Sequence, residues 1–240
     1  MKDIQELIDN SEKYKHIVIQ KRFQSKKNTV CYVLLNNKPC VVKWYAPGFK
    51  KNMQNEYKIL KKGHNQLCIP TLIENDGQHN VLVLSYIPGD NLCDVLHHQS
   101  TSPDEKKRLL ALVAQWYAAF HKLFKTDNSY YIHGDSILRN FVCGDKLYGV
   151  DFEESRIGER QEDIAGFATS VLTTHPMFTK EKFLLCRHFI SQYEQAFGEK
   201  VSLISKDVSY KLLEKIQYRP DDEQLLNSFV NHIRKHGLYF

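Results

Sequence analysis

Residues 131–142 read YIHGDSILRNFV and residues 148–153 read YGVDFE, and these two stretches decide how the rest of the chain is interpreted. In the first, a short apolar run leads into Asp135, and Asn140 follows five residues later. In the second, another apolar run ends in Asp151, eleven residues beyond Asn140. Short apolar runs next to turn residues predict strands, so the three polar side chains are expected at strand ends.

Two carboxylates and an amide in this order indicate magnesium-dependent phosphoryl transfer. In that chemistry one acid, here Asp135, accepts or orients the proton of the attacking hydroxyl. The amide of Asn140 and the carboxylate of Asp151 are ligands suited to the metal that bridges the nucleotide phosphates. Asp135 and Asn140 share one loop, and a hairpin over residues 142–150 is expected to bring them close to Asp151.

The bulk composition is that of an ordinary soluble globular protein. The 240 residues are 42% hydrophobic and 25% charged, which allows one large domain or two lobes with a real core. The net charge of +5, from 33 basic and 28 acidic residues, suits an anionic ligand such as a nucleotide, although scattered surface lysines explain it more simply. It is far below what nucleic-acid binding needs, so no nucleic-acid partner is expected.

The sequence also predicts a cytoplasmic location. No apolar run is long enough to span a bilayer, and the polar first residues do not form a secretory signal. The six cysteines are dispersed and include no Cys-x-x-Cys pair, so buried free thiols in a reducing compartment are expected rather than a zinc site or disulfides.

The first part of the chain reads as a small antiparallel sheet. After an amphipathic helix over residues 3–14, strand-like segments begin at residue 17 and cover residues 29–35 and 40–45, joined by short turns. Residues 81–84 form a hairpin with the segment before the turn at residues 75–77. The extended stretch 85–89 then predicts a hinge, which gives a β-rich lobe over residues 1–86 and a second lobe over residues 87–240.

Lys43 lies in the middle of the third predicted strand, and Glu56 follows it by thirteen residues on a predicted helix. Alone, Lys43 would be a solvent-facing lysine and Glu56 a solvated helix acid. Together with Asp135, Asn140 and Asp151 they match the phosphoryl-transfer template, in which a strand lysine contacts the α- and β-phosphates and a helix glutamate fixes that lysine.

The connection over residues 24–28, QSKKN, stands where a phosphate-binding loop would lie, and it contains no glycine. Glycine helps a backbone approach phosphate closely enough for its N–H groups to bind. Side chains of Ser25, Lys26, Lys27 and Asn28 could contact phosphate instead, or the segment could be a solvated hairpin turn.

The second lobe is predicted to be mainly helical. A long helix runs from Pro103 to about residue 125, with Ser102 as its cap and Glu105 completing a capping box. Further helices are expected over residues 162–172, 180–197, 206–216 and 221–236. Within them, His121 is expected to be a packed or hydrogen-bonded histidine. Asp163 is expected either to cap its helix or to brace the 133–135 loop by accepting backbone N–H bonds.

These residues resemble the protein-kinase-like superfamily, most closely its aminoglycoside phosphotransferase and choline/ethanolamine kinase branch. The residues that carry the likeness are HGD at 133–135 with Asn140, VDFE at 150–153, and Lys43 with Glu56 upstream. The resemblance covers roughly residues 15–172. It implies an α+β bilobal fold, with a small antiparallel β N-lobe and a mainly α-helical C-lobe, and ATP with Mg²⁺ as cofactors.

The resemblance also implies a role for each site residue. Asp135 would be the catalytic base, Asn140 and Asp151 the magnesium ligands, Lys43 the phosphate contact and Glu56 its partner. Four residues would bind adenine, through backbone groups of Ser85 and Ile87 and through side chains of Val41 and Val142. The substrate would be a hydroxyl of a small molecule such as a sugar, an amino alcohol or an antibiotic-like compound.

Two alternatives remain open from the sequence. One is an atypical small protein kinase, similar to the compact kinase of the threonylcarbamoyl tRNA-modification complex, although Glu153 replaces the glycine of the usual protein kinase motif and no activation loop is recognisable. The other is a catalytically silent kinase-fold binding module, which the glycine-free loop favours.

Overall fold

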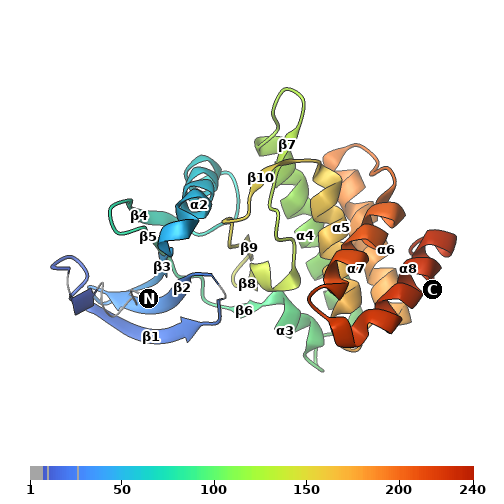
Figure 1. Ribbon diagram of the computed structural model, residues 1–240, viewed down its shortest axis with the longest axis horizontal. Coiled ribbons are helices and arrows are strands. Elements are labelled where there is room, and N and C mark those ends of the chain that lie inside the picture. The colour runs from blue at the N-terminus through green and yellow to red at the C-terminus, as the bar shows by residue number, and fades with distance from the viewer. Residues whose placement is uncertain (1–7, 10, 26) are drawn as a thin grey trace. The chain divides into compact units, whose positions relative to one another are not determined.

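A computed structural model describes residues 8–9, 11–25 and 27–240 (Figure 1). Internal contacts divide the chain into two compact units, Met1–Pro88 with Val150–Ser155, and Gly89–Gly149 with Arg156–Phe240. The sequence-based division keeps residues 150–155 in the second lobe, whereas by its contacts this segment belongs to the first unit. Of the helix expected over residues 3–14, residues 3–7 and 10 lie outside the described residues. Residues 8–9 are helical, but residues 12–14 form a turn, so the helix does not extend to residue 14.

The first unit is built on a five-stranded antiparallel sheet. Its strands are β1 (Ile17–Phe23), β2 (Thr29–Leu35), β3 (Lys38–Trp44), β4 (Leu72–Asp76) and β5 (Val81–Ser85), in the spatial order β1-β2-β3-β5-β4. Asn36 and Asn37 both have positive φ, 51° and 62°, in the two-residue turn between β2 and β3. Such turns match the twist of the flanking strands, and asparagine tolerates the left-handed backbone that they need. The predicted meander is confirmed.

The two faces of this sheet have different roles. One face packs on a core of buried side chains: Ile8, Tyr14, Ile17, Cys31, Val33, Cys40, Val42, Val81 and Val83. Because successive side chains of a strand point to opposite faces, Val41 and Lys43 of β3 face away from this core.

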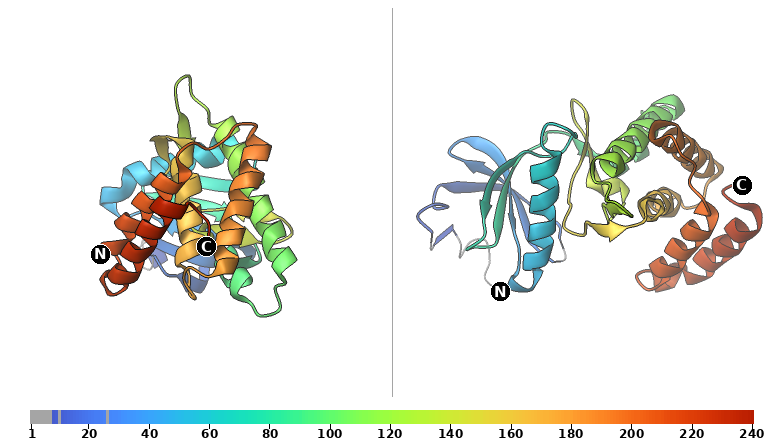
Figure 2. Two further views of the ribbon diagram at one scale, coloured as in Figure 1. Left: turned by 90° about the vertical axis from the view of Figure 1, so that its right-hand side faces the viewer. Right: turned by 90° about the horizontal axis from the view of Figure 1, so that it is seen from above.

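The helix α2 (Lys50–Gly63) follows the short 3-10 helix η1 (Pro47–Phe49) and lies beside the sheet, where it contacts β4 and β5 (Figure 2). Its buried positions recur at the spacing of one helix face: Met53, Glu56, Ile59, Leu60 and Gly63. Glu56 is the charged member of this face, so the helix brings a carboxylate to a position away from water.

The second unit is mainly helical (Figure 1). Its helices are α3 (Leu92–His97), α4 (Pro103–Leu123), α5 (Arg160–Thr173), α6 (Lys180–Phe197), α7 (Ile204–Ile216) and α8 (Glu223–His236), with the 3-10 helices η2 (Leu138–Asn140) and η3 (Pro220–Asp222). Five short strands form two small sheets: β6 (Asp90–Asn91), β8 (Phe141–Cys143) and β9 (Leu147–Gly149) in one, β7 (Tyr130–Ile132) and β10 (Arg156–Gly158) in the other.

Aromatic packing holds these helices together. α4 packs along α6, and α7 packs on α5 and α8. The rings between α4, α5, α6 and β8 are Trp116, Tyr117, Phe120, Phe141, Phe167 and Phe189. Most of these ring pairs are edge-to-face, and such pairs contribute about 0.5–1.5 kcal/mol beyond their buried area. The wide apolar face of α4 is therefore core, as its sequence predicts.

The start of α4 differs in one detail from the prediction. The Ser102 hydroxyl accepts a hydrogen bond from the backbone N–H of Glu105 at 3.2 Å, as expected of the cap. The Glu105 carboxylate binds both Nε and a terminal nitrogen of Arg108 at 2.7 Å, so it does not complete a capping box. A two-point arginine contact is a strong competitor for a carboxylate at this position.

The six cysteines form no disulfide in the described part of the chain. Cys31, Cys40, Cys93 and Cys186 are buried as the sequence predicts, whereas Cys68 and Cys143 are only partly buried. Among residues 8–9, 11–25 and 27–240, no helix has the length and apolar character needed to cross a membrane.

Candidate active site

Lys43 is the centre of an ion cluster in the first unit. Its ammonium lies 2.7 Å from Oε2 of Glu56 and 2.8 Å from Oε2 of Glu153, and it also contacts Oδ1 of Asp151. The side chains of Lys43 and Glu56 are almost completely buried, whereas that of Asp151 is 40% exposed. The structure therefore brings together Lys43, Glu56 and Asp151, three of the residues that the sequence singles out.

Burial and charge act in opposite directions on this lysine. Burial by itself lowers the pKa of Lys43, but the carboxylates of Glu56 and Asp151 outweigh it and hold the pKa well above its ordinary value. A buried ammonium is tolerated only when paired in this way. The Tyr45 hydroxyl donates a hydrogen bond to Oε2 of Glu56, the oxygen that also accepts from Lys43. No pattern in the sequence indicates the contact between Tyr45 and Glu56.

The segment 150–155 is held against α2 and β3 by its backbone as well as its side chains. Asp151 has φ of 66°, an uncommon backbone for a residue other than glycine, and such residues gather at functional sites. The next residue, Phe152, is fully buried, and its N–H points to Glu56 Oε1 at 3.4 Å. The Glu153 carbonyl accepts from the side-chain amides of Asn52 at 3.2 Å and Asn55 at 3.4 Å.

Glu153 places a third carboxylate beside this lysine. Ligand oxygens of Glu56, Asp151 and Glu153 lie within 4.8 Å of one another. Burial raises the pKa of the Glu153 carboxyl, with Lys43 opposing that rise and Asp151 adding to it. Three carboxylates around one ammonium leave an excess of negative charge, which suits a cation such as magnesium.

The connection between β1 and β2 contacts the same segment. Lys27 forms an ion pair with Glu154, and the Asn28 side chain donates to Oε2 of Glu153 at 2.6 Å. The N–H of Asn28 points to the Ser25 hydroxyl at 3.3 Å. Lys26, considered as a phosphate contact, lies outside the described residues.

In the second unit, Asp163 braces the loop that carries Asp135. Its Oδ2 accepts from the His133 N–H at 2.6 Å, and its Oδ1 accepts from the Gly134 N–H at 3.0 Å and the Ser136 hydroxyl at 2.6 Å. The bracing role considered for Asp163 is thus observed. The capping alternative is not, because α5 begins after Glu159, whose N–H donates to Glu162 at 3.1 Å.

His121 completes this buried network. Its ring nitrogens lie 3.0 Å from Asp163 Oδ2 and 2.9 Å from the Tyr193 hydroxyl, so it is the packed, hydrogen-bonded histidine that the sequence predicts. Burial acts to raise the pKa of Asp163, but the bond from His121 and its charge outweigh it, and the pKa lies below its ordinary value. Gly134 has φ of 84°, a backbone that favours glycine at this position of the motif.

Asn140 holds Asp135 in place. Its side-chain nitrogen donates to the Asp135 carbonyl at 2.8 Å and to Asp135 Oδ2 at 3.0 Å. Lys215 of α7 also interacts with this carboxylate. Burial and the charge of Arg219 lower the pKa of Lys215, while Asp135 acts to raise it. Sequence reasoning missed Lys215, because no local pattern marks a lysine on α7 as a residue influenced by Asp135.

The predicted adenine contacts are divided between the two units. Ser85 ends β5, and its N–H donates to the Thr71 carbonyl at 2.9 Å. Ile87 follows it, half-buried, and Val41 lies two residues before Lys43 on the same face of β3. Val142 belongs to β8 of the second unit. Asp135 and Asn140 also belong to the second unit, so their sharing of a metal with Asp151 stays a prediction.

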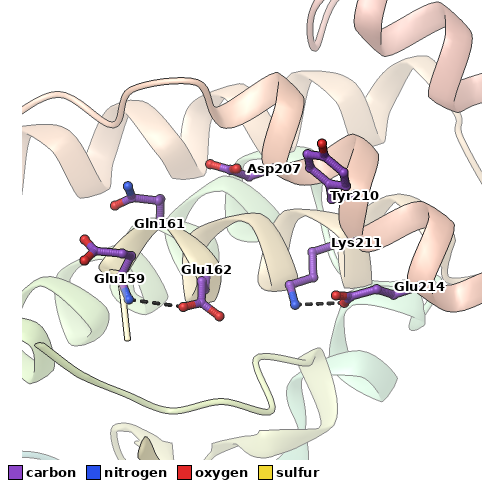
Figure 3. A pocket seen from close by; sticks show the side chains of 7 residues that line it. All are labelled: Glu159, Gln161, Glu162, Asp207, Tyr210, Lys211 and Glu214. Atoms are coloured by element: carbon purple, nitrogen blue, oxygen red, sulfur yellow. Dashed lines mark hydrogen bonds and ion pairs between the residues drawn. The ribbon is translucent and has the colours of Figure 1, made fainter. Parts of the chain in front are cut away.

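A pocket of about 310 Å³ lies on the second unit between the start of α5 and α7 (Figure 3). Its lining is mostly acidic: Glu159, Gln161, Glu162, Asp207, Tyr210, Lys211 and Glu214. Part of this charge is already paired, because Arg156 binds Glu162 at 2.6 Å and Lys211 binds Glu214 at 2.8 Å. None of the residues predicted for the active site is among those that line it.

Comparisons with known proteins agree with this architecture. No model of a known protein family matches the chain. Over 116 residues, 48% of the chain, it is 23% identical to the probable bifunctional tRNA threonylcarbamoyladenosine biosynthesis protein of Thermoplasma volcanium. That match spans only 20% of the archaeal protein.

Among solved structures, a candidate aminoglycoside phosphotransferase from Ralstonia eutropha JMP134 superposes with a TM-score of 0.63. The superposition covers 82% of this chain and 79% of that one, at 11% identity. At this identity the likeness establishes the fold. The class is α+β, with an antiparallel N-terminal sheet followed by a mainly helical region. The fold is the protein-kinase-like one that the HGD and DFE stretches predict.

Proposed function

We propose that this protein is an ATP- and magnesium-dependent phosphotransferase that transfers the γ-phosphate to a hydroxyl group of a small molecule. The observation that carries the proposal is the buried Lys43 held at 2.7 Å by Glu56 and in contact with Asp151. A buried ammonium fixed beside a half-exposed carboxylate supplies one contact for phosphate oxygens and one for a divalent cation. The likeness to the candidate phosphotransferase structure supports the same reaction class.

Each predicted residue has a role in this proposal. Lys43 contacts the α- and β-phosphates, and Glu56 keeps its ammonium in position. Asp151 and Asn140 hold the magnesium, which neutralises charge on the β- and γ-phosphates when bound. The residues suit that ion, because Asp151 offers carboxylate oxygens and the Asn140 nitrogen is engaged by Asp135, which leaves the amide oxygen as its ligand atom.

The adenine ring is assigned to the end of β5. The Ser85 N–H already donates to Thr71, so the carbonyl is the backbone group that Ser85 offers to the purine. Ile87 supplies a backbone N–H, and the side chains of Val41 and Val142 contact the ring.

The transfer step uses Asp135 as the proton acceptor. The acceptor hydroxyl oxygen bonds to the γ-phosphorus, the bond from that phosphorus to the β–γ bridging oxygen breaks, and ADP leaves. The hydroxyl proton passes to Oδ1 of Asp135, since Oδ2 already accepts from Asn140 at 3.0 Å. Asp163 fixes the loop, so that the carboxylate stays oriented for this step.

The test is an ATP-consumption screen over sugars, amino alcohols and aminoglycoside antibiotics, with Asp135→Asn as the blank. We expect an acceptor that raises ATP consumption by the wild type, and a loss of about 10² to 10⁴ in that rate for Asp135→Asn. Retention of near-normal, acceptor-dependent consumption by Asp135→Asn would show that the role given to Asp135 is wrong.

A second candidate is an atypical small protein kinase that works with the tRNA-modification machinery. The observation that favours it is the similarity to the Thermoplasma protein. Transfer of radioactive phosphate to the protein itself or to a protein acceptor, without stimulation by any small molecule of the panel, would favour this candidate over the first.

A further inference from the structure

The connection between β1 and β2 contains one residue that behaves unlike its neighbours. Gln24, Ser25 and Lys27 are exposed, as expected for a polar hairpin turn, whereas Asn28 is 8% exposed. An asparagine in a turn ordinarily bonds to nearby backbone or to water. Here the side chain turns inward and reaches a residue 125 positions further along the chain, Glu153. Its burial therefore reflects a tertiary contact and not the requirements of the turn.

That contact leads directly to the proposed phosphate-binding lysine. The Asn28 amide nitrogen lies 2.6 Å from Oε2 of Glu153, and the same oxygen lies 2.8 Å from the ammonium of Lys43. One carboxylate oxygen thus joins the loop to the lysine. Glu153 is itself fixed, because its backbone carbonyl accepts from Asn52 and Asn55 of α2.

The Asn28 amide contacts Glu153 through its nitrogen and not through its oxygen. With its nitrogen on Glu153, its oxygen is buried and accepts no hydrogen bond within the described part of the chain. A buried acceptor without a donor is unfavourable. The amide keeps this orientation because the alternative would place its oxygen against a carboxylate.

We propose that Asn28 is a positioning residue for the nucleotide phosphates, which it serves by anchoring the glycine-free loop to Glu153 and so fixing Glu153 beside Lys43. This inference rests on the proposed function and adds to it how a loop without glycine is held near the lysine. In place of backbone flexibility, the loop uses a side-chain bond to the segment that carries Asp151.

The direction of the effect follows from the charges. Without the Asn28 donor, the buried Glu153 carboxylate depends more strongly on Lys43 and withdraws that ammonium from phosphate oxygens. The loop also loses its inner attachment. Both changes weaken binding of nucleotides that carry phosphates, and neither acts on the adenine contacts. Neutralising Glu153 removes the competition for Lys43, so Asn28 then has little left to control.

The experiment measures dissociation constants for ATP with magnesium, and for adenosine, by calorimetry. The variants are Asn28→Ala, Glu153→Gln and the double substitution, with Gln24→Ala as a control at an exposed position of the same loop. Asn28→Ser serves as a second variant that suits a turn but is too short to reach Glu153. Circular dichroism melting of each protein without ligand confirms that it is folded.

We expect Asn28→Ala and Asn28→Ser to bind ATP about tenfold or more weakly than the wild type, the loss typical of a hydrogen bond to a charged group. The affinity of both variants for adenosine and the affinity of Gln24→Ala for ATP should equal those of the wild type. In the Glu153→Gln background, the effect of Asn28→Ala falls below about threefold, because interacting residues are not additive.

Three results would overturn the inference while leaving the proposed function intact: unchanged ATP binding by Asn28→Ala, an equal loss for ATP and adenosine, or the same loss in both Glu153 backgrounds. Absence of ATP binding by the wild type would instead refute the proposed function, and the inference with it.

Discussion

Asp163→Asn is predicted to damage both the stability of the second unit and the active-site loop. Asp163 accepts four hydrogen bonds, two at each oxygen: Oδ1 from Gly134 and Ser136, and Oδ2 from His133 and His121. Asparagine keeps one oxygen and places an NH₂ group where the other was. Two donors then face an N–H group inside a site that is almost completely buried.

The size of the effect follows from this count. A hydrogen bond to a charged group contributes about 1.5–3 kcal/mol, so two lost bonds correspond to about 3–6 kcal/mol. Where the NH₂ group faces His121, a ring nitrogen without a proton can accept from it, so only the bond from the His133 N–H is lost and about 1.5–3 kcal/mol is expected. The assay is urea unfolding followed by circular dichroism. Asp127→Asn, the same chemical change at an exposed position, should stay within about 0.5 kcal/mol of the wild type.

The pH dependence of the unfolding free energy provides a second test of Asp163→Asn. Because the pKa of Asp163 in the folded protein lies below its ordinary value of 3.8, its contribution is complete above that value and is lost as the pH falls through the folded-state pKa. The stability difference between wild type and Asp163→Asn should be constant from about pH 5 to 8 and shrink in stronger acid. A loss below about 1 kcal/mol at pH 7, with transfer activity retained, would refute the bracing role of Asp163.

Three further predictions concern single residues. Lys43→Met leaves three carboxylates without their ammonium, so stabilisation by ATP and magnesium should disappear. For the wild type, a ligand at 100 times its Kd adds about 2.7 kcal/mol to the unfolding free energy and raises the melting temperature. A thermal shift equal to that of the wild type would argue against the phosphate contact. Gly134→Ala forces a side chain onto a backbone with φ of 84° and should lower the unfolding free energy by about 1–2 kcal/mol in urea titrations, whereas an unchanged midpoint would mean that the loop relaxes without strain. Burial lowers the pKa of Lys182 to about 8, so between pH 8 and 10 the folded protein releases a proton that the unfolded chain keeps. The unfolding free energy of the wild type should therefore rise with pH in this range relative to that of Lys182→Met. Parallel pH profiles of the unfolding free energy for the two proteins would contradict this.

Local patterns in the sequence were sufficient for most of the secondary structure. A run rich in β-branched and aromatic residues marks β2 at Thr29–Leu35, and helical spacing marks α6 at Lys180–Phe197, with the bounds that the structure has. Ser102 marks the start of α4 because a hydroxyl there satisfies a helix N–H that has no partner in the helix. The carboxylate of Glu105 was predicted wrongly because Arg108, one helical turn away, offers two donors to it.

The site was predictable only where a chemical template fixes the residue types. Lys43 and Glu56 are thirteen residues apart and meet because a strand and the next helix are adjacent, which the template anticipates. The contact between Asn28 and Glu153 joins residues 125 positions apart, and the electrostatic effect of Asp135 on Lys215 depends on how α7 packs. Neither has a local pattern, since each arises from tertiary packing.

The same reason explains the division of the chain. Residues 150–155 follow the second-lobe hairpin in sequence, so a linear reading keeps them there. Their bonds run instead to Lys43, Asn52 and Asn55, which places the carboxylates of Asp151 and Glu153 in the unit that carries the lysine.

The most direct test of the proposed phosphotransferase is to follow the phosphate itself. ATP labelled with ¹⁸O at the terminal phosphate is incubated with magnesium, the wild type and each acceptor of the panel. The masses of the products are then measured by mass spectrometry. One acceptor is expected to gain a labelled phosphate in equal amount to the ADP released, with no such product from Asp135→Asn. If no acceptor gains the label, or if Asp135→Asn transfers it as fast as the wild type, the assignment of this site to small-molecule phosphoryl transfer is contradicted.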